Sequence, residues 1–174
     1  GLKFLIIIAG VLDILIAFVF FAFLGKGSPV VKALMAGSFF VVTLASVFIH
    51  PDPVKMASGV FRYGMIDRTN RVLFHKDGKT ATIAVYETNS GNIVLSTNGK
   101  PDASVNIYRQ VSGDEATQVL LAALPMDLYY GAENVAVIGL GSGKTAHTAL
   151  MNFRLKRLTA IEIERAVVEA THYF

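Results

Sequence analysis

Residues 134–146 read NVAVIGLGSGKTA, and this stretch decides the fold that we predict for the second half of the chain. Residues 135–138 have the composition of a buried strand, and glycines follow at positions 139, 141 and 143. Residues 145–153 can form a helix, residues 158–163 read as a second strand, and residues 166–174 begin a second helix. The order strand, glycine loop, helix and strand predicts the opening βαβ unit of a doubly wound, Rossmann-like sheet.

The glycine loop has the residue types that nucleoside ligands require. Glycines permit the tight turn and let a ligand approach the backbone without meeting Cβ atoms, and the next helix begins with unpaired N–H groups. An acidic residue at the tip of the second strand can accept hydrogen bonds from both ribose hydroxyls. Glu162 is our choice for that acid, and Glu164 is the second candidate. The predicted ligand-binding loop residues are Gly139, Leu140, Gly141, Ser142 and Gly143.

Several ligand classes compete for this loop. Residues 141–145 copy the end of a P-loop, but the P-loop spacing requires glycine where the chain has Ile138, so that class is excluded. The dinucleotide fingerprint needs glycine at Lys144, although its alanine-tolerant version, from Gly141 to Ala146, keeps NAD open. The G-x-G-x-G spacing is typical of folds that bind adenosylmethionine-type ligands. The glycines are also compatible with a simple strand–helix turn.

The N-terminal part of the chain predicts a membrane anchor. Residues 5–24 are apolar except for Asp13, and about 20 helical residues span about 30 Å, the thickness of the hydrocarbon core. A second apolar run covers residues 33–49, extended at its start by Val30 and Val31, and residues 25–29 (GKGSP) form a tight turn between the two. We predict two transmembrane helices. Two buried helices of a soluble core are the alternative, and a signal peptide would explain only the first run.

The distribution of basic residues predicts the orientation. Six basic residues lie between positions 55 and 79, after the second span, which places the soluble part in the cytoplasm of a multi-pass protein of the bacterial inner membrane. Asp13 in the first span is read as a proton or cation relay or as a packing group paired with a further helix. The chain has a net charge of +3 and no cysteine, which argues against nucleic-acid binding and excludes disulfides and Cys-based zinc sites.

Between the spans and the glycine loop, the pattern changes to a period of two. Residues 80–87 and 92–97 alternate like strands, and residues 88–91 and Asn98-Gly99 are turn signals. We predict a small antiparallel sheet of three to four strands that acts as a lid or platform. The predicted organisation is two transmembrane helices (1–50), an interfacial linker (51–70), an antiparallel β-hairpin domain (71–112) and the N-terminal part of a Rossmann-like domain (113–174).

Four segments together resemble the spermidine/spermine synthase family, and most closely its membrane-fused bacterial members. They are the Asp114–Pro125 run, the glycine loop, the AIEIE motif at residues 160–164, and LSTNGK at residues 95–100, which is similar to the family's L-x-L-D-G hairpin. The resemblance covers about residues 71–174. It implies a β-domain packed on a methyltransferase-like core, and transfer of an aminopropyl group from decarboxylated S-adenosylmethionine, as co-substrate, to an amine such as putrescine.

The resemblance also assigns roles to single residues. Residues 139–143 match the cofactor loop, Glu162 matches the ribose-binding acid, and Gln118 matches a residue that lines the ligand and substrate site. The family's loop Asp is Ser142 here, its Tyr and Glu beside Gln118 are Thr117 and Val119, and a ligand-contacting Gln falls at Ala81. The catalytic Asp segment is expected downstream of Phe174. No metal is expected, because no histidine pair has ligand spacing.

The sequence thus predicts a membrane-anchored, spermidine synthase-like transferase. Its expected partners are a small-molecule amine, the lipid bilayer, further transmembrane helices and a second copy in a homo-oligomer, with no nucleic acid. The alternatives are a membrane protein that senses or transports an adenosyl ligand or polyamine without turnover, and another adenosylmethionine-dependent transferase. Because the chain starts at Gly1 and stops within a helical pattern, we expect it to be part of a longer protein and inactive alone.

Overall fold

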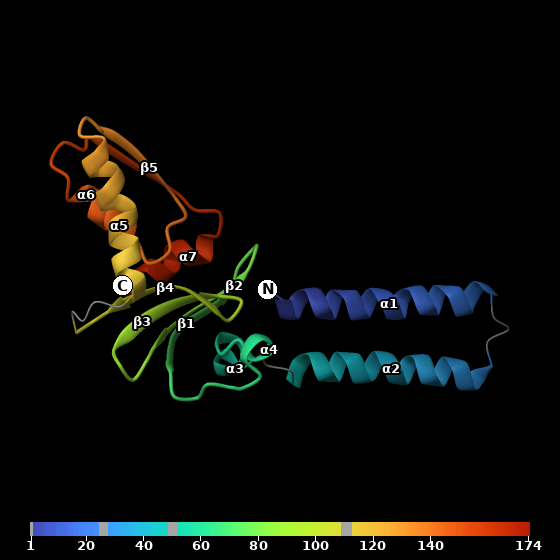
Figure 1. The fold of residues 1–174 in the computed structure, drawn as a ribbon. Coiled ribbons are helices and arrows are strands. Elements are labelled where there is room, and N and C mark those ends of the chain that lie inside the picture. Colours follow the sequence, from blue (N-terminus) through green and yellow to red (C-terminus); the bar gives the residue numbers. More distant parts are fainter. Residues whose placement is uncertain (1, 25–27, 49–51, 109–112) are drawn as a thin grey trace. The chain divides into compact units, whose positions relative to one another are not determined.

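The structure is a computed structural model that describes residues 2–24, 28–48, 52–108 and 113–174. The contacts divide the chain into two compact units, residues 1–51 and residues 52–174. Figure 1 shows two long helices in the first unit and a mixture of strands and shorter helices in the second. The finer boundaries at residues 70 and 112 stay a prediction.

Helices α1 (Leu2–Leu24) and α2 (Pro29–Phe48) form an antiparallel pair. They lie close at Gly10, where an added Cβ would be 3.6 Å from Val42 Cγ1. Helix α2 begins at Pro29, earlier than the predicted start near residue 33, because proline suits the first helical position and the Ser28 carbonyl accepts the Val31 N–H at 3.0 Å. Residues 25–27 of the predicted turn lie outside the described residues.

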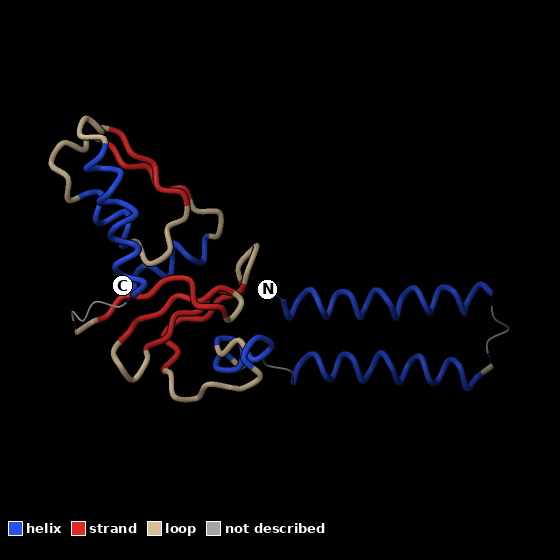
Figure 2. The backbone as a smooth tube through the Cα atoms, in the orientation of Figure 1, coloured by secondary structure: helices blue, strands red, loops and turns tan. Residues whose placement is uncertain are grey.

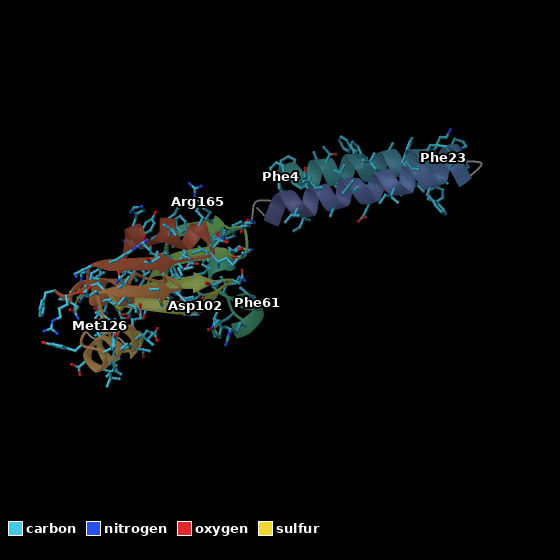
Figure 3. All side chains as sticks on the ribbon, turned by 90° about the horizontal axis from the view of Figure 1, so that it is seen from above. Phe4, Phe23, Phe61, Asp102, Met126 and Arg165 are labelled. Carbon is cyan, nitrogen blue, oxygen red and sulfur yellow. The ribbon has the colours of Figure 1, made fainter. Side chains whose placement is uncertain are left out.

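Both helices are long and apolar enough to cross a membrane by length and composition, and none of the 18 residues in either apolar window is buried in the structure. Phe4 and Phe23, labelled in Figure 3 near the two ends of α1, are 70% and 86% exposed. The hydroxyls of Ser38, Thr43 and Ser46 donate to carbonyls of their own helix. These polar groups therefore need no water.

The second unit begins with two short helices where the sequence predicted a connector. They are α3 (Pro53–Ala57) and α4 (Val60–Tyr63). Asp52 caps α3 by accepting the Val54 N–H at 2.9 Å, and Gly59 separates the two helices with a φ of 59°. Residues with a side chain disfavour this left-handed conformation. Glycine adopts it easily, and this lets the chain reverse direction at Gly59.

A four-stranded antiparallel sheet follows in the order β1-β2-β3-β4. Its strands are among those drawn in red in Figure 2. The strands are β1 (Arg71–Asp77), β2 (Thr82–Glu87), β3 (Asn92–Thr97) and β4 (Lys100–Asn106). This confirms the predicted small antiparallel sheet. The turn between β3 and β4 has positive φ at both Asn98 (50°) and Gly99 (74°), as a primed hairpin turn requires.

The register of β4 contains a bulge at Asp102. Leu95 of β3 pairs with Ala103, while the next residue, Ser96, pairs with Pro101, so that Asp102 is the extra residue. An extra residue bends the strand and re-aims its side chain.

The remaining elements form a βαβ unit preceded by a long helix. They are α5 (Gly113–Leu128), β5 (Asn134–Ile138), α6 (Lys144–Leu150), β6 (Arg157–Ile161), α7 (Arg165–Ala170) and a final 3-10 turn (Thr171–Tyr173). Strands β5 and β6 pair in parallel from Asn134↔Arg157 to Ile138↔Ile161, which confirms the predicted βαβ order.

Three predicted bounds need correction. Helix α6 ends at Leu150 instead of residue 153, and β6 ends at Ile161, which puts Glu162 just past the strand. The last helix stops at Ala170 and tightens into the 3-10 turn. Helix α5 continues past Pro125 to Leu128, since the hydrogen bond from Tyr129 N to the Pro125 carbonyl (2.9 Å) extends the helical turn beyond the proline.

The hydrophobic core of the second unit joins α7 to the sheet. Figure 1 shows α7 next to the antiparallel sheet, and the main buried cluster joins α7 to β2, β3 and β4. The members of this cluster are Ile83, Val85, Ile93, Leu95, Ala103, Ala166, Val167 and Ala170. Helix α7, which follows the βαβ unit, thus shares a core with the antiparallel sheet, and Leu140 of the glycine loop packs against this core.

Candidate functional site

The glycine loop between β5 and α6 uses its glycines for backbone geometry. Gly139, Gly141 and Gly143 have φ values of 85°, 55° and 82°, a region that other residues rarely adopt. The Gly139 N–H still donates to the Ile161 carbonyl of β6 at 2.8 Å, so the loop leaves the sheet directly after Ile138. The loop therefore stands at the carboxyl ends of both parallel strands.

Glu162 meets this loop. Its Oε2 accepts the Leu140 N–H at 2.8 Å, and its Oε1 accepts the Glu164 N–H at 2.9 Å. The contact arises because β5 and β6 are parallel neighbours, which brings the residue after β6 beside the loop after β5. The structure thus brings together the glycine loop and the acid that the sequence predicted for the ribose.

A cavity of about 250 Å³ lies between the loop and the antiparallel sheet. Gly141 and Glu162 line one side, and Leu95, Thr97 and Asp102 of the sheet line another. An added Cβ on Gly141 would lie 3.6 Å from Ala103 Cβ, so the loop apex lies close to β4. The antiparallel sheet is a wall of the candidate site, in keeping with the predicted platform.

Glu164, the second candidate for the ribose, is instead a clamp within the fold. It is 4% exposed and caps α7, since its Oε1 accepts the Ala166 N–H at 3.0 Å. Its Oε2 accepts both the N–H and the hydroxyl of Thr80, at 2.7 and 2.8 Å. The turn before β2 passes so close that a Cβ on Gly78 would lie 2.3 Å from the Glu164 carboxyl group.

These hydrogen bonds predict acid sensitivity. The Ala166 N–H, followed by the two Thr80 donors, lowers the pKa of Glu164 from 4.5 to about 2. A depressed pKa in the folded state means that the stabilisation by Glu164 is complete above about pH 4.5 and is lost as the pH falls towards 2. We expect the melting temperature of the wild-type protein to fall more steeply between pH 4.5 and 2 than that of Glu164→Gln.

The control for this comparison is Glu133→Gln, because the Glu133 side chain is half exposed and forms an ion pair with Lys156 at the surface, at 2.7 Å. Between pH 4.5 and 2, the melting temperature of Glu133→Gln should fall as steeply as that of the wild type. If the melting temperatures of Glu164→Gln and the wild type fall equally as the pH falls, the pKa of Glu164 is the same in the folded and unfolded states. The predicted acid sensitivity is then wrong.

Gln118 contacts the glycine loop, and its predicted role in lining the ligand site stays a prediction. Its Nε2 donates to the Ser104 carbonyl of β4 at 3.0 Å, and its Oε1 accepts the Ser142 hydroxyl. Its own carbonyl accepts the Thr145 hydroxyl at 3.0 Å. The structure therefore gives Gln118 of α5 contacts that position the loop.

The two acids at the start of α5 contact β4 and the helix that follows the loop. Asp114 accepts the Ser104 hydroxyl at 3.0 Å, and Glu115 forms an ion pair with Lys144 at 2.6 Å in which the side chains are only 15% and 29% exposed. The pairing of Glu115 with Lys144 depends on the packing of α5 against α6, which no spacing rule between the two residues could reveal.

The sequence also missed Thr80, Thr97 and Asp102 on the cavity wall. Thr80 and Thr97 lie beside strand ends of the sheet, and Asp102 is the bulge residue of β4. The sequence does not show which face of the sheet the glycine loop covers, so it could not identify these three residues as part of the cavity wall.

Comparison with solved structures finds a spermidine synthase-like fold. A spermidine synthase in complex with the transition-state analogue AdoDATO matches with a TM-score of 0.53 and 21% identity, over 60% of this chain and 33% of that chain. The spermidine synthase from Thermotoga maritima matches with the same TM-score and identity, over 60% of this chain and 35% of that one. The chain thus spans about a third of the length of both proteins.

No protein-family model and no curated protein matches the chain. At 21% identity, the likeness to the solved structures shows the fold. It confirms the fold that the glycine loop and the hairpin signals predicted for the second unit.

Proposed function

We propose that this chain belongs to a membrane-anchored aminopropyltransferase that uses decarboxylated S-adenosylmethionine and a polyamine acceptor such as putrescine. One observation carries the proposal. The Glu162 carboxylate accepts a hydrogen bond from the glycine loop, and both line a cavity whose other side is the antiparallel sheet. The spermidine synthase-like fold supports the same activity, and one of the similar structures contains AdoDATO.

The residues of the loop fit the adenosyl part of this co-substrate. Gly141 offers a backbone without a side chain at the cavity, where a ligand can approach closely. Each carboxylate oxygen of Glu162 accepts one backbone N–H and keeps a second lone pair, so both oxygens can accept a ribose hydroxyl as well. Gln118 contacts the loop at Ser142, and the Glu115–Lys144 ion pair holds the start of the helix that follows the loop.

The proposed reaction is a displacement at carbon. The deprotonated amine of the acceptor attacks the methylene carbon next to the sulfonium, a C–N bond forms and the C–S bond breaks. The bonding electrons go to sulfur, which leaves as the neutral thioether methylthioadenosine, and the new ammonium loses a proton. The protein must orient the two reactants, and a carboxylate must take up or stabilise the proton.

The membrane anchor is part of the proposal. Helices α1 and α2 have the length and apolar surface of spanning helices. The basic residues between positions 55 and 79 favour a cytoplasmic location for the second unit. The lipid bilayer and a small amine are therefore the proposed partners, and a bacterial inner membrane is the proposed location.

The test uses the protein solubilised in detergent. Calorimetry with decarboxylated S-adenosylmethionine, S-adenosylmethionine and NADH ranks the ligands, and mass spectrometry after addition of putrescine measures spermidine and methylthioadenosine. We expect the decarboxylated compound to bind best and the two products to appear in equal amounts. Binding without product would favour the sensing alternative, and binding of NADH alone would exclude all transferase interpretations.

A further inference from the structure

A second cavity, of about 270 Å³, lies between the α3–α4 segment and strands β1 and β2. Figure 1 shows α3 and α4 beside the antiparallel sheet. Val54, Ala57 and Met65 give the cavity apolar walls, and Tyr63 and Tyr86 line it as well. It shares no lining residue with the cavity at the glycine loop, so it is a separate place on the molecule.

Among the described residues that line this second cavity, only Asp67 is charged. Its Oδ1 accepts the N–H and the hydroxyl of Thr69, at 2.9 and 2.6 Å, and its Oδ2 accepts the Asn70 amide at 2.7 Å. The Thr69 hydroxyl, followed by the Thr69 N–H, lowers the pKa of Asp67, so the carboxylate is ionised at neutral pH. Because all these donors are neutral, they leave its charge unbalanced, and Oδ2 keeps a lone pair for one more donor.

The phenol of Tyr86 lies near this carboxylate. Burial raises the pKa of Tyr86 above its ordinary value of 10, and the neighbouring Tyr63 and Asp67 raise it further, so the hydroxyl keeps its proton. Carboxylate and hydroxyl oxygens accept hydrogen bonds, and the face of a tyrosine ring attracts a cation. These groups together fit a primary ammonium, which has three N–H donors. A quaternary ammonium has none, so they discriminate against it.

The surface beside the second cavity carries the opposite charge. Arg62 and Arg68 are exposed, and neither forms an ion pair within the part of the chain that the structure describes. The Arg62 guanidinium carbon lies 6.0 Å from the centre of the Tyr63 ring, which places this cation next to the cavity. Phe61, labelled in Figure 3, is 80% exposed, and Met65 is 68% exposed. Guanidinium groups bind phosphate, and exposed apolar side chains beside basic ones are typical of a segment at a lipid surface.

The length of the chain keeps this segment near the lipid surface. Helix α2 ends at Phe48 and α3 begins at Pro53, so four residues join them and reach at most about 18 Å. The headgroup layer on each side of the hydrocarbon core is about 6 Å thick. In the proposed membrane anchor, the start of α3 therefore stays within reach of the headgroups at the end of α2.

We infer that the second cavity binds the headgroup of an ethanolamine phospholipid, with the ammonium at Asp67 and Tyr86 and the phosphate at Arg62. This inference rests on the membrane anchor of the proposed function and does not depend on the proposed reaction. The ethanolamine headgroup carries a primary ammonium and a phosphate, so it complements both the acid in the cavity and the base beside it. A serine headgroup adds a carboxylate that Asp67 repels, and a glycerol headgroup has no cation.

The test uses native mass spectrometry of the full chain in detergent, with added phospholipids that share their acyl chains and carry an ethanolamine, choline or glycerol headgroup. We expect the wild type to bind the ethanolamine lipid about tenfold more tightly than the choline lipid, because the primary ammonium makes a charge-assisted hydrogen bond. Asp67→Asn should abolish this preference, since asparagine keeps an acceptor for the Thr69 donors but has no charge. Its binding of the glycerol lipid should stay within about twofold of the wild type.

Further variants test the two ends of the headgroup separately. Tyr86→Phe removes one acceptor without a change of charge and should reduce the preference for ethanolamine over choline about threefold. Arg62→Ala should weaken the binding of the ethanolamine and glycerol lipids by the same factor, about fivefold, since both carry a phosphate. Asp127→Asn is the matched control, because Asp127 is an exposed acid of α5 that does not line the cavity, and it should keep the tenfold preference.

The outcomes distinguish this inference from the proposed function. Equal binding of the ethanolamine and choline lipids by the wild type overturns the inference and leaves the membrane anchor in place. The inference is also wrong if Asp67→Asn melts as the wild type does and keeps the preference, or if water-soluble phosphoethanolamine binds as tightly as the lipid, which would identify a free metabolite as the ligand. If the chain stays in solution without detergent and does not insert into vesicles, the membrane anchor itself is wrong.

Discussion

Replacing Glu162 with alanine is expected to weaken methylthioadenosine binding about 100-fold, the sum of two lost hydrogen bonds from ribose hydroxyls to a charged acceptor. The same change removes the acceptor of the Leu140 N–H, which loosens the glycine loop at the place where the ligand would approach it. Glu162→Gln keeps one acceptor oxygen and should lose about tenfold. Calorimetry on the protein in detergent measures both affinities.

Glu133→Ala is the matched control for Glu162→Ala. Glu133 is also an acid of the βαβ unit, but it is 50% exposed, and its carboxylate pairs with Lys156 at the surface. The control should bind methylthioadenosine as the wild type does. If Glu162→Gln keeps its melting temperature and binds the ligand within about twofold of the wild type, the ribose role of Glu162 is wrong, and the aminopropyltransferase proposal loses its main support.

The local chemistry of the site was readable from the sequence because it depends on residues close together in the chain. The glycines at 139, 141 and 143 adopt the positive φ values that their spacing suggested, and Glu162 follows β6 as the βαβ pattern required. Both features follow from rules that connect residue type to backbone geometry within a few positions.

The contacts between distant segments were not readable in this way. Gln118 was expected at the ligand site, but its hydrogen bonds to Ser104 and Ser142 depend on the packing of α5 beside β4, which the sequence does not show. Glu164 was a candidate for the ribose and is a clamp, because α7 packs on the sheet next to Thr80. Asp102 had no signal in the sequence, since a bulge is defined by the register with the partner strand.

The turn at Asn98-Gly99 has one feature that the sequence shows and one contact that it does not. Substitution of Gly99 is expected to cause a large loss of stability. The dipeptide predicted a hairpin, and the structure confirms it, with the Asn98 side chain accepting the Thr82 N–H at 2.9 Å. The structure adds a contact 40 positions away, because a Cβ on Gly99 would lie 2.4 Å from the Cα and 2.6 Å from the N of Gly59. The clash is with backbone, which cannot rotate away.

Gly99→Ala should therefore lower the free energy of unfolding of the second unit by about 3 kcal/mol. About 1 kcal/mol of this comes from forcing alanine to a positive φ, and the rest comes from separating the hairpin from the segment that joins α3 to α4. Thermal unfolding of the protein in detergent, followed by circular dichroism, should show a melting temperature lower by about 10 °C. The shift of β4 should also weaken ligand binding, since Asp102 lies three residues further on.

Gly113→Ala provides the control for Gly99→Ala. A Cβ at Gly113 would meet no atom within 4 Å, and the residue begins helix α5, where alanine is the better helix former. Its melting temperature should equal or slightly exceed that of the wild type. If Gly99→Ala melts as Gly113→Ala does, the close contact with Gly59 does not exist in solution, and the wall of the cavity that contains Asp102 is not held from the α3–α4 side.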